Sequence, residues 1–152
     1  LPYAFAGHFA PEQMDMAFKI YREHFEPSKY LDKPFVLACV NGIAAETSEE
    51  AHFLSTTLFQ AFINIIRNDR KPFAPPVDDM DEIWSPMEKS MVLQKLRYTF
   101  IGNQEEVKEK LKNFQERFQV DELMINSHIY DHQKRLRSYE IFREAANSLS
   151  KA

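Results

Sequence analysis

Six residues that could bind a small molecule lie at or near the ends of three strand-like segments. They are Gly7, His8 and Phe9, then Asn41, and finally Ser127 and His128. Hydrogen-bonding and aromatic side chains with small residues between them suit a planar ligand that is held by stacking and polar contacts. The set contains no pair of carboxylates, so the two-carboxylate chemistry of glycosidases is not supported. None of the six is assigned as catalytic.

The histidines in and near this set raise two other chemistries. His128 and His132 are four residues apart with Asp131 between them, and His8 could face them, so a metal-dependent barrel hydrolase is an alternative. A polar rim in which His132 caps or solvates the last helix accounts for the same residues, and we assign no metal ligand. Ser127 and His128 resemble half of a hydrolase dyad, but neighbours on a strand point to opposite faces, and no GxSxG motif is present.

The elements that must position these residues alternate between strand and helix. Apolar runs at residues 1–9, 35–46 and 121–129 are each followed by an amphipathic helical pattern. Long crossovers between strands indicate a parallel sheet with right-handed connections. The Gly-rich first turn of an open nucleotide-binding sheet is absent, whereas a closed barrel needs no such turn and places function at the carboxyl ends of its strands. The sequence therefore predicts an α/β fold, the C-terminal part of a (β/α)8 TIM barrel.

Helix boundaries are predicted by their capping residues. A helix should begin at Pro11, another after Thr47 with Phe53 and Ile65 on its apolar side, and others after Ser85, Asn103 and Asp131. Residues 68–85 form a proline-rich stretch without periodicity, which predicts an irregular insertion on the surface. Residues 1–152 are expected to form a single unit of about three β/α repeats plus this insertion.

Composition excludes several classes of protein. The 152 residues are 44% hydrophobic and 28% charged, which predicts one globular unit with a core. A net charge of −4 without a dense Lys/Arg run argues against nucleic-acid binding. No apolar stretch approaches the roughly 20 residues that span a bilayer, and no signal peptide is visible, so we expect a cytoplasmic protein without membrane contact. The lone Cys39 is expected to be a reduced, buried thiol.

Four segments resemble the bacterial luciferase-like, flavin-dependent monooxygenase family. They are LPYAFAGHFAP at the start, PPVDDMDEIWSP in the insertion, FIGNQEEVKEKL, and DELMINSHIYDHQKRLRSYEIF near the end. The last two are the most specific. The resemblance covers nearly the whole chain and implies the C-terminal portion of a TIM barrel, with the three strands as the sixth, seventh and eighth.

The family resemblance also implies a function and a cofactor. Reduced FMN, or a deazaflavin in its place, would bind at the mouth of the barrel and use O₂ to oxygenate a small organic substrate, with electrons from NAD(P)H directly or through a separate flavin reductase. Gly7, His8 and Phe9 would contact the flavin, and Asn41, Ser127 and His128 would line the substrate side. A homodimer is expected. The family's flavin-phosphate contacts and its best-described catalytic histidine lie largely upstream of these motifs, so the chain alone is expected to be inactive, and a non-catalytic subunit or fragment is a further alternative.

Overall fold

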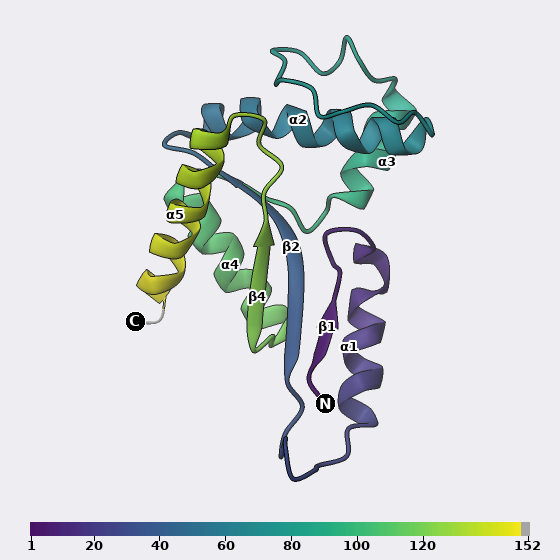
Figure 1. The fold of residues 1–152 in the computed structure, drawn as a ribbon, viewed down its shortest axis with the longest axis vertical. Coiled ribbons are helices and arrows are strands. Elements are labelled where there is room, and N and C mark those ends of the chain that lie inside the picture. Colours follow the sequence, from purple (N-terminus) through teal and green to yellow (C-terminus); the bar gives the residue numbers. More distant parts are fainter. Residues whose placement is uncertain (150–152) are drawn as a thin grey trace.

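The longest strand, β2 (Val36–Ala44), organises the sheet in the computed structural model, which describes residues 1–149. Its first half pairs with β1 (Tyr3–Phe5) on one side and with β4 (Glu122–Asn126) on the other. Its last three residues pair with β3 (Phe100–Gly102). All three pairings are parallel, so the carboxyl ends of β1, β2 and β4 lie at the same end of the molecule, the upper end in Figure 1. The predicted α/β class with a parallel sheet is confirmed.

One of the four strands was not predicted. The sequence predicted strands only at residues 1–9, 35–46 and 121–129, but Phe100–Gly102 also form a strand, β3, beside Gly42, Ile43 and Ala44. A strand of three residues is too short to show alternation in the sequence. Its pairing with the end of β2, far away in the chain, is what defines it. The estimate of three β/α units therefore missed one short strand.

Five α-helices connect or flank these strands, and the first is preceded by a short 3-10 turn at Pro11–Gln13. The predicted caps are present at several of them: Ser85 and Asn103 each form a full capping box, with Glu88 and Glu106 respectively. Asp131 Oδ1 accepts a hydrogen bond of 2.8 Å from the backbone N–H of Lys134. The helices are α1 (Met14–Glu23), α2 (Ser48–Ile66), α3 (Pro86–Lys95), α4 (Gln104–Phe118) and α5 (His132–Leu149).

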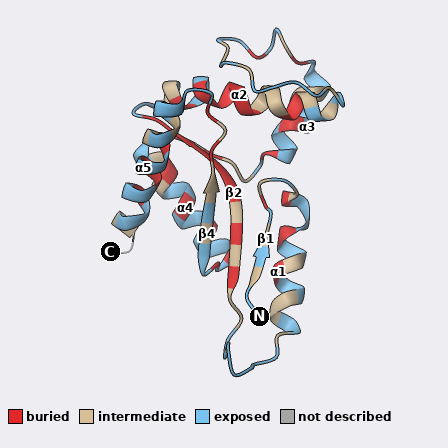
Figure 2. Ribbon diagram, viewed as in Figure 1, coloured by how far each residue is buried: buried red, intermediate tan, exposed pale blue. Residues whose placement is uncertain are grey.

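The two faces of the sheet differ in how they are covered. Ala38 and Val40 of β2 lie in a core that is completed by α1, α4 and α5, and Figure 2 shows β2 buried along much of its length. Side chains alternate along a strand, so their neighbours Leu37 and Cys39 point to the opposite face. These two are only half-buried, and Met124 of β4, which pairs with Cys39, is 53% exposed. This face of the sheet is therefore uncovered along the first half of β2 in residues 1–149, whereas Asn41 and Ile43 farther along the same face are buried.

The segment between α2 and α3 has neither helix nor strand, and it lies along α2. Thr57 Oγ1 on α2 donates a hydrogen bond of 3.0 Å to the carbonyl oxygen of Ala74. The two ends of the segment are joined by Arg67, whose Nε donates to Glu88 Oε1 at 2.6 Å. Hydrogen bonding from Arg67, and then from Ser85, lowers the pKa of Glu88 to about 2. A second core, which includes Trp84, lies beneath this segment. Within residues 1–149, no helix is long and apolar enough to cross a membrane.

Candidate functional site

The chain just after β1 is fastened to the middle of β2, because β2 continues to Ala44 beyond the point where β1 and β4 end. The backbone N–H of His8 donates to the carbonyl oxygen of Cys39 at 2.7 Å, and Asn41 Nδ2 donates to the carbonyl oxygen of His8 at 3.1 Å. Gly7 allows this approach, because a Cβ atom there would lie 2.9 Å from Met14 Sδ and 3.0 Å from the Cys39 carbonyl oxygen. The predicted site residues of the first two strands are thus brought together.

Four of the six predicted residues carry a buried polar atom without a hydrogen-bond partner. Asn41 is 2% exposed and Ser127 is 5% exposed. Buried polar groups are nearly always paired, so an unpaired group indicates a position where a ligand or water is received. In the part of the chain that the structure describes, the unpaired atoms of this kind are His8 Nδ1, Asn41 Oδ1, Ser127 Oγ and His128 Nδ1.

His128 lies close enough to His8 for their charges to interact. Burial lowers the pKa of His128, and the charge that His8 can carry lowers it further. The ring of Phe73, from the insertion, meets the His128 ring edge-on at a centroid distance of 5.2 Å and an angle of 66°. His128 is therefore a half-buried imidazole that favours the neutral form, and its buried Nδ1 has no hydrogen-bond partner within residues 1–149.

Phe9 is exposed, and Ser127 does not pair with its neighbour His128. Phe9 follows the turn after β1, and its side chain is 62% exposed. Ser127 is adjacent to His128, but its backbone N–H donates to Tyr139 Oη on α5 at 3.2 Å, and its hydroxyl makes no hydrogen bond to His128. A serine–histidine dyad is therefore not formed.

The histidines considered as metal ligands do not form a cluster. His132 Nδ1 lies 2.9 Å from Nη2 of Arg135 on the exposed surface of α5. Across residues 1–149, no group of three or more His, Cys, Asp or Glu side chains is arranged to hold a metal ion. The geometry of the described residues thus gives no support to the hydrolase alternative.

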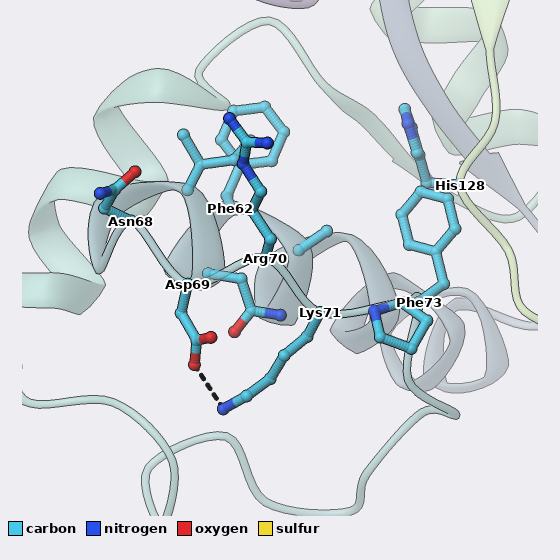
Figure 3. Close-up of a pocket in the computed structure, with 11 residues that line it drawn as sticks. Phe62, Asn68, Asp69, Arg70, Lys71, Phe73 and His128 are labelled. Atoms are coloured by element: carbon cyan, nitrogen blue, oxygen red, sulfur yellow. Dashed lines mark ion pairs between the residues drawn. The ribbon is translucent and has the colours of Figure 1, made fainter.

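A pocket of about 560 Å³ adjoins His128 and was not predicted from the sequence. Figure 3 shows Phe62 and Arg70 toward one end of it and Phe73 with His128 at the other. The last turns of α2 and residues 68–73 of the insertion form its walls. The only sign of this pocket in the sequence was Phe73, an aromatic residue in a polar, proline-rich stretch. Its contact with His128 could not be predicted, because the two residues lie far apart in the chain.

Comparisons with known proteins agree with this architecture, although no protein-family model matches the chain. The Bacillus subtilis protein YvbT is 45% identical over 144 residues, which cover 95% of this chain and 43% of the relative. A luciferase-like monooxygenase of Escherichia coli K12 is 39% identical over 149 residues, 98% of this chain and 44% of the relative. The chain thus spans less than half the length of these relatives.

The fold has a counterpart among solved structures. The crystal structure of apo-MsnO8 superimposes with a TM-score of 0.76 and 25% sequence identity, over 97% of this chain and 45% of that one. The sequence match to a protein named as a luciferase-like monooxygenase confirms the resemblance that the four motifs indicated. By sequence and by fold, the chain belongs to the luciferase-like family of monooxygenases.

Proposed function

We propose that this chain forms one side of the active site of a monooxygenase that uses reduced FMN and O₂ to oxygenate an organic substrate. The observation that carries the proposal is the set of unpaired polar atoms on His8, Asn41, Ser127 and His128, which lie just after β1, within β2 and just after β4. In a parallel α/β fold the carboxyl ends of strands are where ligands bind. The family name of the Escherichia coli relative supports oxygenation as the reaction class.

The residues present fit a flavin. Its ring system is planar with polar atoms along one edge, which matches unpaired nitrogens on His8 and His128 and the unpaired amide oxygen of Asn41. Gly7 lets the chain after β1 lie against the Cys39 carbonyl and so positions His8, and the exposed ring of Phe9 is free to stack. Bound reduced flavin would supply the two electrons with which O₂ is activated, and NAD(P)H, directly or through a reductase, would renew them.

The residues of the chain would bind, orient and exclude water. A neutral His128 can offer a hydrogen-bond donor or acceptor without introducing a charge, which suits a site that must hold an uncharged oxygen-containing group. Phe73 covers one side of that ring and limits the access of water to it. When water is excluded from the site, the activated oxygen can react with the organic substrate instead of with water.

We propose further that the sheet belongs to a (β/α)8 barrel in which β1, β2 and β4 are the sixth, seventh and eighth strands. The helices α1, α4 and α5 cover one face, as the outer ring of a barrel would, and the other face carries the half-buried Leu37 and Cys39. Relatives more than twice as long leave ample chain for the remaining strands. A homodimer is part of the same proposal.

Removal of the His8 ring tests the flavin site in the full-length protein. We expect His8→Ala to weaken FMN binding by roughly tenfold, the effect of losing one hydrogen bond, and to lower NAD(P)H- and O₂-dependent turnover. FMN fluorescence quenching measures the first and oxygen consumption the second. His24→Ala, at an exposed histidine that follows α1, is the matched control and should change neither.

Two results would contradict this assignment. If His8→Ala binds FMN as tightly as the unaltered protein, the flavin does not contact this edge of the sheet. If the full-length protein binds no flavin and elemental analysis finds stoichiometric zinc, the monooxygenase proposal fails and the hydrolase alternative returns.

A further inference from the structure

The pocket beside His128 combines an apolar wall with charged groups at its rim. Its lining includes Phe62 and Ile65 from α2 and Phe73 from the insertion, which present aromatic and aliphatic surface. A volume of about 560 Å³ lies within the range of small-molecule sites, which is roughly 300–1,000 Å³. The pocket can therefore hold a ligand with an apolar body of moderate size.

Among the charged residues of the rim, Arg70 alone lacks an ion pair within residues 1–149. Lys71 Nζ is 2.5 Å from Asp69 Oδ2, so these two charges offset each other. Figure 3 shows the Lys71 side chain turned toward Asp69 and the Arg70 side chain extending in another direction, alongside the pocket. A guanidinium group has five N–H donors in a planar fork that matches the two oxygens of a carboxylate. The rim therefore has a net positive charge that is carried by a free Arg70.

The inner end of the pocket has a different character. His128 favours its neutral form, its Nδ1 is unpaired, and the Phe73 ring lies against it. A neutral imidazole beside an aromatic ring accepts an uncharged part of a ligand far better than an anionic one. The pocket is therefore positively charged at the Arg70 end and uncharged at the His128 end.

We infer that this pocket binds an organic anion, with its carboxylate at Arg70, its apolar body against Phe62, Ile65 and Phe73, and its uncharged end at His128. The conclusion that this anion is the substrate of the monooxygenase rests on the proposed function. The conclusion that the pocket binds the anion does not. The end of the ligand that reaches His128 is the end presented to the strand edge. The group to be oxygenated therefore lies at the end of the molecule remote from its negative charge.

A pair of probes that differ only in charge tests the site. Octanoate and octan-1-ol share an eight-carbon chain, and calorimetric titration of each into the flavin-free, full-length protein gives its Kd. We expect Arg70→Gln to weaken octanoate binding by roughly fivefold, as for a solvent-accessible ion pair, and to leave octan-1-ol binding unchanged. Arg143→Gln, at an exposed arginine of α5 away from the pocket, is the matched control and should alter neither.

A second variant separates the apolar wall from the charge. Phe73→Ala should weaken both probes by a similar factor, because it removes surface that each chain contacts. If Arg70→Gln leaves octanoate binding unchanged, the anion assignment is overturned. If neither probe binds, or if Phe73→Ala changes neither Kd, the pocket assignment is overturned. These titrations contain no flavin, so they test the pocket separately from the flavin site. If octanoate binds as predicted but the full-length protein does not bind flavin, only the monooxygenase proposal is overturned.

Discussion

His128 is the residue at which burial, charge and an aromatic contact meet. Its side chain is half-buried, its Nδ1 is unpaired, and Phe73 covers its ring. A structural histidine in a core normally has both ring nitrogens satisfied. The unpaired Nδ1 is therefore unusual for a packed histidine, and the structure places this residue between the end of β4 and the adjacent pocket.

The lowered pKa of His128 predicts a pH dependence of stability. Burial, and then the charge of His8, lower this pKa below its ordinary value of 6.5, so the unfolded state binds the proton more readily than the folded state. The free energy of unfolding should therefore fall as pH falls from 6.5 toward the lowered pKa, and should not change from this cause above 6.5. Urea unfolding at pH 7 and pH 5 measures the difference.

Replacement of the ring identifies the source of that difference. His128→Gln should reduce the loss of stability between pH 7 and pH 5, because glutamine does not titrate. His24→Gln, at an exposed histidine, should leave the loss unchanged. An identical pH dependence in His128→Gln and the unaltered protein would show that the folded state does not disfavour the charged form of His128.

At the scale of elements, the packing of α5 on the sheet depends on Gly42. A Cβ atom at this position would lie 2.6 Å from Ile125 Cγ2 and 2.6 Å from Phe142 Cζ. These distances are shorter than any ordinary contact between carbon atoms. The helix can approach β2 and β4 closely only because the strand has no side chain at this point.

Gly42→Ala should therefore destabilise the protein by about 1–3 kcal/mol, the usual cost of overpacking a core. Phe142→Leu in the same chain should recover part of that loss, because it removes the ring atoms that the new methyl group meets. Urea unfolding of the two single variants and the double variant gives the coupling free energy. Strictly additive effects would mean that the steric conflict with Phe142 does not limit the packing of α5.

The predicted apolar side of α2 was only partly right. Leu54, Leu58 and Phe62 of this helix are buried, but Phe53 and Ile65, which were predicted to lie on the apolar side, are exposed. Helical periodicity shows which side of a helix is apolar but not how wide its buried surface is. That width depends on what packs against the helix. Here Ile65 lines the pocket beside His128, a role that only the folded insertion creates.

At the scale of the whole molecule, the uncovered face of the sheet distinguishes a closed barrel from an open sheet. Met124 is 53% exposed in residues 1–149, so a charge at this position would cost little if the face stays open. In the proposed barrel the same side chain points inward and is surrounded by the other strands. Met124→Asp should then cost about 3 kcal/mol or more, as for an uncompensated buried charge.

Met16→Asp is the matched control for this test. Met16 lies on α1 and is exposed, whereas Met14 and Phe18 of the same helix are buried in the core. Its replacement should cost less than about 1 kcal/mol, since surface changes are usually small. Urea unfolding of the two variants in the full-length protein provides the measurement, and equal, small losses would contradict the barrel.

Much of this architecture follows from local signals in the sequence. The capping residues Ser85 and Asn103 mark helix starts because their side chains bond to backbone N–H groups only three residues away. The site residues His8, Asn41 and His128 could be named because parallel strands place their carboxyl ends at one edge, so that topology alone predicts their proximity.

Tertiary structure decided what depends on contacts between distant parts of the chain. Strand β3 is defined by its pairing with β2. The pocket depends on the contact of Phe73, from the insertion, with His128. The four polar atoms are unpaired because no hydrogen-bonding group of residues 1–149 lies near them. Local propensity extends over a few residues, whereas burial, pairing and pocket shape depend on the whole fold. The sequence by itself therefore determined which residues could act, and the tertiary structure decided their burial, their partners and the direction of the pocket beside them.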